Sequence, residues 1–151
     1  MKMNTKLFLA LLIAAVALTA CASRSGLRDA ERLALYRAHA GEPVDSIYMP
    51  GHYNGWTPLD GGTFALWTRP SQAWLIELYG PCTDMGYVDK IRIEQPTGRL
   101  TARFDRIHVG GAGLMPLQCT IREIRPLDIK AIRVAEKKAR EDRQRAGSSG
   151  T

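Results

Sequence analysis

The chain has 151 residues, and its 21 Lys and Arg residues outnumber its 15 Asp and Glu residues. The excess is not spread evenly, because the segment Cys21–Asp128 has 12 basic and 12 acidic residues. A nucleic-acid-binding protein normally has a basic face on its folded part. The charge distribution therefore argues against nucleic acid as a partner, although the sequence pI is about 9.5.

Residues 1–20 have the pattern of a secretory signal peptide. Lys2 and Lys6 precede an uncharged apolar run, Leu7–Ala20, and this order is typical of export signals. The run has 14 residues, fewer than the roughly 18 that a membrane-spanning helix needs. A buried helix of a soluble domain is the alternative, but such a helix would have a polar face.

The residues that end this run, 18–21 (LTAC), resemble the lipobox of bacterial lipoprotein precursors. The resemblance implies that Cys21 is acylated and becomes the first residue of the mature chain. Lipoproteins of this kind have several acyl chains on this cysteine, which are enough to anchor the protein stably to a membrane. Ala22 rather than Asp follows it. By similarity to sorted lipoproteins of Gram-negative bacteria, this implies an outer-membrane protein that faces the periplasm. Residues 21–26 would form a short tether.

The 131 residues that follow the leader are enough for one domain but not for two. We expect a single β-rich periplasmic domain over 27–128 that begins with a helix. Residues 27–40 are predicted to be helical, because apolar side chains recur at spacings of three and four. Gly41 and Pro43 then have the residue types that commonly follow a helix.

From Val44 the hydrophobic period changes to two, which is typical of β-strands. The apolar parity changes between Phe104 and Ile107, which predicts a β-bulge near Asp105-Arg106. Short antiparallel strands at regular spacing favour a small barrel or sandwich, so the fold class is mainly β (α+β by residue count). About six strands are predicted: Val44–Met49, Thr63–Thr68, Ala73–Tyr79, Val88–Glu94, Arg99–Val109 and Leu117–Ile124.

Residues 129–151 are predicted to be a basic helical tail. Asp128 can cap a helix that runs to about Arg145, and its charged pairs stand at the favourable i,i+4 spacing. We expect residues 147–151 to be disordered. Anionic lipid headgroups attract Lys and Arg clusters near a membrane, so anionic lipid is one expected partner. An envelope protein with an acidic surface and a merely solubilising helix are the alternatives.

The cysteine count agrees with export. If Cys21 is acylated, Cys82 and Cys119 remain as a pair, and an even remainder in an oxidising compartment indicates a disulfide. Closing this loop would stabilise the fold by about 4 kcal/mol in the chain-entropy model. A metal pair or two free thiols are the alternatives, but no further Cys or His stands at zinc-ligand spacing.

Three segments of the chain are distinctive: the Pro81-Cys82 loop, the Phe104-Asp105 strand and the ending from Cys119-Thr120-Ile121 to Pro126-Leu127. With these segments, the chain over about Val44–Asp128 resembles a family of small proteobacterial lipoproteins of unknown function. The resemblance implies a β-rich fold and supports the disulfide, and it provides no catalytic residues.

The richest candidate binding segment is the loop 48–56 (YMPGHYNGW). Its candidate ligand residues are Tyr48, His52, Tyr53 and Trp56. Rings on a loop can stack on sugar faces, and peptidoglycan is the glycan that a periplasmic protein meets. The alternative is that Tyr48 and Trp56 fill the end of the barrel, while Asn54-Gly55 only turns the chain.

No catalytic or cofactor motif is complete. Ser46, His52 and Asp60 can be combined into a hydrolase-like group, but no nucleophile-elbow context supports it. A metal site with His52 and His108 lacks a third ligand, and the glycines of 110–113 lack the Lys of a P-loop. We therefore expect no cofactor, no metal and no catalysis. The predicted function is a membrane-anchored envelope interaction module for glycan, lipid or a partner protein; the alternative is a small envelope enzyme that uses the His52 region.

Overall fold

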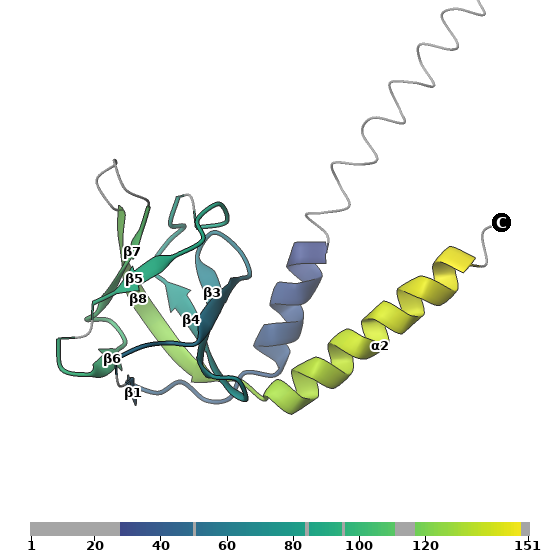
Figure 1. The fold of residues 1–151 in the computed structure, drawn as a ribbon, viewed down its shortest axis with the longest axis horizontal. Helices are drawn as coiled ribbons and strands as arrows, with labels where there is room; N and C mark the ends of the chain where they lie inside the picture. The colour runs from purple at the N-terminus through teal and green to yellow at the C-terminus, as the bar shows by residue number, and fades with distance from the viewer. Residues whose placement is uncertain (1–27, 50, 84, 95, 111–116, 149–151) are drawn as a thin grey trace, which may run out of the picture.

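The computed structural model describes residues 28–49, 51–83, 85–94, 96–110 and 117–148. The predicted signal peptide, Cys21 and the tether lie outside the described residues. The described elements, shown in Figure 1, are an N-terminal helix (28–38), β1 (Ser46–Tyr48), β2 (Gly55–Pro58), β3 (Thr63–Arg69), β4 (Gln72–Leu78), β5 (Ile91–Ile93), β6 (Arg99–Thr101), β7 (Arg106–Val109), β8 (Leu117–Pro126) and α2 (Ile129–Ser148).

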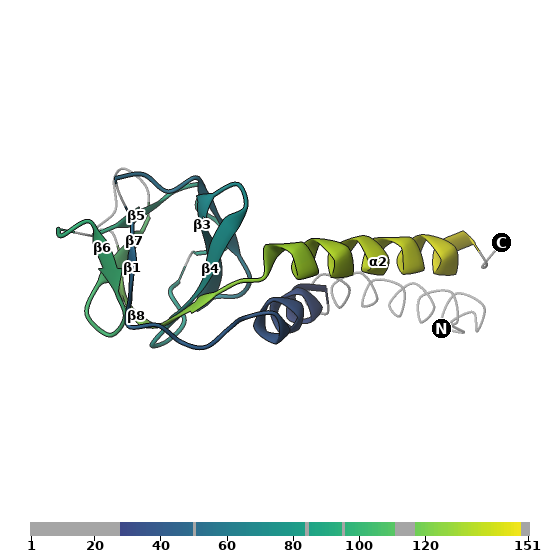
Figure 2. The ribbon, with the colours of Figure 1, turned by 90° about the horizontal axis from the view of Figure 1, so that it is seen from below.

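Six of the strands form one curled antiparallel sheet in the order β2-β3-β4-β8-β7-β5. The ten-residue β8 joins its two parts, because its second half pairs with β4 and its first half with β7. Strands β1 and β6 form a separate two-stranded sheet. The predicted class is confirmed: the fold is mainly β, one helix precedes the strands in the chain and α2 follows them, and the six-stranded sheet is curled as in a barrel (Figure 2).

Both faces of β3 and β4 are covered, which explains their almost continuous hydrophobic sequences. Phe64 and Ile76 belong to the inner core, to which the two-stranded sheet contributes Ile47 and Leu100. Side chains of the opposite parity point to the other face of a sheet. They form an outer core with the two helices, made of Tyr36, Leu59, Ala65, Ala73, Leu75, Leu127, Ile129 and Ile132.

The predicted strand Arg99–Val109 is wrong in its middle. Its ends are two strands in different sheets, β6 paired with β1 and β7 paired with β5 and β8. The residues between them turn the chain, with Arg103 at a φ of 66°. Asp105 closes this turn, because its Oδ2 accepts the Thr101 N–H at 2.6 Å. A turn, rather than the predicted bulge, is therefore the cause of the parity change.

Two further strand predictions differ from the structure. No strand is predicted between Val44–Met49 and Thr63–Thr68, yet Gly55–Pro58 form β2 and pair with β3. The segment Val88–Glu94 pairs only over Ile91–Ile93. The sheet therefore begins with a short strand that contains glycine and proline, both of which are rare within strands.

The two helices pack on the outer face of the sheet and extend away from it side by side (Figure 2). The Tyr36 hydroxyl donates to Glu136 Oε1 at 3.3 Å and joins one helix to the other. Asp128 caps α2 as predicted, since its Oδ1 accepts the Ala131 N–H. The helix ends at Ser148, three residues beyond the predicted end at Arg145. Among the described residues, no helix is long and apolar enough to cross a membrane.

Candidate functional site

Two of the four candidate ligand residues in the loop 48–56 support the fold. The Tyr53 hydroxyl donates to the Ile91 carbonyl at 2.6 Å, and its ring packs against the inner core. Trp56 also packs there, with its ring edge-on to Phe64 at a centroid distance of 6.0 Å. These two rings are therefore not displayed for a ligand.

Tyr48 and His52, in contrast, are exposed, and Tyr48 retains 69% of its accessible surface. The other two rings of the loop, Tyr53 and Trp56, pack against the inner core instead. The structure does not gather the rings of the loop into one site.

The groups proposed for catalysis have other contacts. Ser46 Oγ accepts from Arg99 at 2.6 Å, and Asp60 Oδ1 accepts the Gly62 N–H at 2.7 Å. The Tyr53 hydroxyl donates to the Ile91 carbonyl and is likewise occupied. The geometry adds no support for a hydrolase-like site in the His52 region.

The possible metal ligands are also separate. His108 is buried, with its Nε2 2.7 Å from Glu94 Oε1, whereas His52 is exposed. Within the described part of the chain, no group of three or more His, Cys, Asp or Glu side chains is arranged to hold a metal ion.

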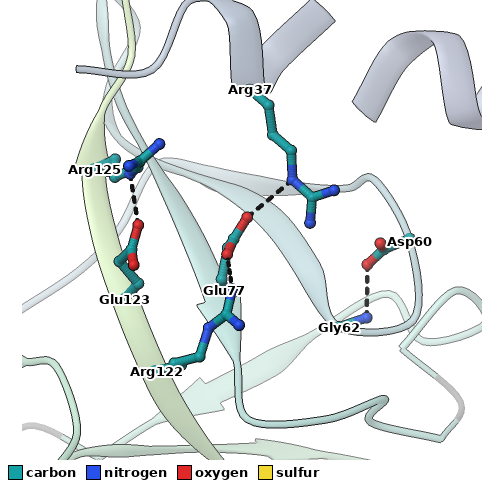
Figure 3. Close-up of polar contacts among 7 residues, drawn as sticks. All are labelled: Arg37, Asp60, Gly62, Glu77, Arg122, Glu123 and Arg125. Carbon is teal, nitrogen blue, oxygen red and sulfur yellow. Dashed lines mark hydrogen bonds and ion pairs between the residues drawn. The ribbon is translucent and has the colours of Figure 1, made fainter. Parts of the chain in front are cut away.

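A more organised group of polar side chains lies in an open cleft of about 380 Å³. We call it the Glu77 cleft; it is lined by Arg37, Arg122 and the segments 60–63 and 77–81. The N-terminal helix, the β2–β3 turn, the end of β4 and the middle of β8 therefore all contribute to it. Figure 3 shows the central polar residues, which come from parts of the chain far apart in the sequence.

Glu77 lies at the centre of this cleft, and its side chain is only 11% exposed. It stands on the same face of β4 as Ala73 and Leu75, which belong to the outer core. Oε1 accepts from Arg37 Nε at 3.0 Å, and Oε2 accepts from the Arg122 guanidinium. Two charge-assisted hydrogen bonds thus compensate the burial of the carboxylate.

A β-bulge places Arg122 at this position. Glu77 stands opposite Glu123 and Leu78 opposite Ile121, so Arg122 is the extra residue of β8. Bulges commonly redirect a side chain beside a functional site. The bulge in the pairing of β4 with β8 therefore allows Arg122 to contact Glu77.

Glu77 accepts from only some of the N–H groups of Arg37 and Arg122. The side chains of Arg37 and Arg122 are 48% and 49% exposed, and each guanidinium has five donors in a planar fork. Figure 3 shows the terminal nitrogens of Arg37 beyond the Glu77 contact, on the side of Asp60. The two cations and the two carboxylates of Glu77 and Asp60 balance in charge. The cleft thus presents planar donors and acceptors with no excess of either charge.

Tyr79 forms part of the rim and is 61% exposed. The loop that follows it is fixed by the disulfide between Cys82 and Cys119, whose Cα atoms are 6.0 Å apart. The predicted pairing of these two cysteines agrees with the structure. The Cys82 N–H also donates to the Gly61 carbonyl at 2.6 Å. These two links connect the loop after β4 to β8 and to the β2–β3 turn.

The sequence contains only one local signal for this site. Glu77 is a single carboxylate in the otherwise apolar stretch from Trp74 to Leu78, and such a residue within a buried strand requires a partner. Its partners Arg37 and Arg122 are 40 and 45 residues away. Only the folded topology brings the three side chains together.

Comparison with known proteins provides a family but no activity. The model of a family of unknown function (DUF6491) matches residues 3–143. No curated protein matches the chain, and no solved structure matches it.

Proposed function

Because the chain belongs to the family of unknown function DUF6491, we propose its function from its own residues. We infer that it is a lipid-anchored, non-catalytic binding module of the bacterial cell envelope that holds a glycan in the Glu77 cleft. Peptidoglycan is the polymer that a periplasm-facing protein of the outer membrane would meet.

The envelope location rests on the sequence pattern of residues 1–21. The disulfide between Cys82 and Cys119 supports it, because such bonds form and persist in oxidising compartments. Acylation of Cys21 would leave six residues between the anchor and Arg28. A fully extended tether of this length reaches at most about 25 Å, so the domain would stay near the membrane.

The observation that favours ligand binding is the arginine–glutamate–arginine group on the floor of an open cleft. The guanidinium groups of Arg37 and Arg122 are accessible to a ligand, because both side chains are about half exposed. Their remaining N–H groups are held in a fixed orientation by Glu77. Ordering these side chains before a ligand arrives lowers the entropy cost of binding.

The chemistry of the cleft favours a polyhydroxyl ligand. The planar groups of Arg37, Arg122 and Asp60 can donate to and accept from neighbouring hydroxyls, and their balanced charge does not select for a phosphate. Tyr79 presents an exposed ring at the rim, whose apolar face can contact the C–H face of a sugar. The cleft also lies within the usual range for small-molecule sites, about 300–1,000 Å³.

The test is co-sedimentation of the purified full chain with isolated peptidoglycan, comparing two exposed tyrosines. Removing the ring in Tyr79→Ala should weaken binding about tenfold, which corresponds to about 1.4 kcal/mol. Tyr48→Ala is the matched control, since this ring is similarly exposed but does not line the cleft. Thermal unfolding of both variants checks that the fold is intact.

Arg122→Gln provides the second variant and should also weaken binding, because it removes donors from the cleft floor. If the chain binds peptidoglycan and both cleft variants bind as well as the unmodified protein, the assignment of the cleft is wrong. Equal loss in Tyr48→Ala and Tyr79→Ala would likewise contradict a localised site.

A further inference from the structure

The two helices form a second surface, separate from the Glu77 cleft. A groove of about 510 Å³ lies between the N-terminal helix and α2. Arg28 and Arg32 line it from one helix, and Arg140 and Arg143 line it from the other. Leu35, Ala135 and Ala139 provide apolar surface between them. A groove with small apolar side chains and arginines along it differs in character from the polar cleft on the barrel.

The outer half of α2 continues this surface beyond the barrel. Ile129 and Ile132 are buried against the sheet, whereas every residue from 137 to 146 is exposed. Figures 1 and 2 show this half of the helix projecting away from the strands. A helix in a protein is normally stabilised by burial of an apolar face. Among the described residues, none buries a side chain of residues 137–146.

The charge of the chain is concentrated on the same half. Residues 137–146 have five basic and two acidic side chains, whereas Cys21–Asp128 is balanced. Lys137 is 3.9 Å from Glu141, and Asp142 is 3.9 Å from Arg145, so both acidic residues lie beside cations of the same helix. For Lys138, Arg140 and Arg143, no described residue is an ion-pair partner.

Three acidic residues also line the groove and limit its charge. Asp29 is 3.9 Å from Arg32, and Glu136 accepts from Tyr36. Glu31 is exposed. The groove alone therefore has a small positive charge, and the larger excess comes from the outer half of α2.

We propose that the interhelical groove and the outer half of α2 form a docking surface for anionic phospholipid, with Arg140 and Arg143 of the groove binding the headgroup phosphates. Lys137, three residues before Arg140 on the same side of the helix, adds positive charge to this surface. Charge complementarity selects the anionic headgroup, because cationic side chains near a membrane are attracted to such lipids. The apolar residues between the arginines can contact the glycerol and upper acyl region. If Cys21 is acylated, as the proposed function holds, the tether starts at the N-terminal helix, next to this surface.

The test measures partitioning of the full chain onto vesicles of phosphatidylglycerol with phosphatidylethanolamine and onto neutral phosphatidylcholine vesicles. The ratio of the two partition coefficients is the readout, because apolar contributions from the leader or an acyl chain largely cancel in it. Lys137→Gln/Arg140→Gln/Arg143→Gln should reduce this ratio about 100-fold, at roughly fivefold for each cation near the surface. Raising the salt concentration should reduce it in the unmodified chain.

A matched variant, Lys90→Gln/Arg92→Gln/Arg99→Gln, removes three exposed cations from the barrel and should leave the ratio unchanged. Gln preserves helix propensity, and circular dichroism confirms that α2 is retained. Amide hydrogen exchange then localises the contact, since residues 137–146 should exchange more slowly on anionic vesicles only. Equal loss in both triple variants, or no preference for anionic vesicles, would overturn the proposal. Neither result depends on glycan binding at Tyr79, so the two proposals fail separately.

Discussion

Replacing Glu77 by Gln removes the charge of the buried carboxylate while keeping the size of the side chain. Two charge-assisted hydrogen bonds are affected, and such bonds contribute about 1.5–3 kcal/mol each. Because Arg37 and Arg122 are about half exposed, water can replace part of what they lose. We therefore expect Glu77→Gln to lower the free energy of unfolding by about 2 kcal/mol.

The assay is urea unfolding followed by tryptophan fluorescence, with thermal unfolding as a second measurement. A loss of about 2 kcal/mol should lower the melting temperature by about 8 °C for a domain of this size. Glu123→Gln is the control, since Glu123 pairs with Arg125 beside the cleft (Figure 3), and both side chains are about one-third exposed. Pairs of this kind contribute about 0.5 kcal/mol.

A double-mutant cycle separates the ion pair from other effects of the substitution. Combining Glu77→Gln with Arg122→Gln should cost clearly less than the sum of the two single losses, because the second change removes a group that the first left unpaired. If Glu77→Gln is no more destabilising than Glu123→Gln, or if the two losses are additive, then the buried group does not contribute as described.

Three other outcomes follow from the structure. Burial and the neighbouring Glu136 raise the pKa of Tyr36 from 10.0 to about 12. The protonated hydroxyl therefore contributes stability that is fully present below pH 10 and is lost as the pH rises through 12. In urea unfolding between pH 8 and 11.5, the free energy of unfolding of Tyr36→Phe should fall less with rising pH than that of the unmodified chain. A Cβ on Gly62 would lie 3.2 Å from the Gly80 carbonyl oxygen, so Gly62→Ala should lower the melting temperature and weaken peptidoglycan binding, unlike Gly55→Ala, where the space is open. Reducing the disulfide should lower the free energy of unfolding by about 4 kcal/mol, and an unchanged urea midpoint in reductant would contradict that value.

Much of the fold was predictable, because the spacing of apolar residues along the chain indicates helices and strands directly. The helix predicted over 27–40 agrees with the described helix 28–38, and the period-two pattern located β3, β4 and β8. The turn at Arg103 was missed because a bulge and a turn both reverse the parity of a strand. The pairing partners of the flanking strands decide between them, and partners are not visible in a local pattern.

The candidate site was predicted poorly for a related reason. The composition of the loop 48–56 cannot show whether a ring points outward, and Tyr53 and Trp56 prove to be packed against the core. Glu77 is the one residue of the cleft with a local signal, a carboxylate in an apolar strand, whereas Arg37 and Arg122 are not distinctive where each occurs in the sequence. Their proximity depends on a bulge in β8 and on the position of the N-terminal helix, both of which are consequences of tertiary structure.

The position of β8 also constrains when the domain can fold. It is the last of the described strands in chain order, yet it lies in the middle of the six-stranded sheet, between β4 and β7. Until β8 is available, the β2-β3-β4 and β5-β7 segments have no common strand to pair with, and such non-local pairing is slow to form. An incomplete chain therefore lacks the element that joins the two parts of its sheet. The six-stranded sheet therefore cannot be completed before β8 has been synthesised.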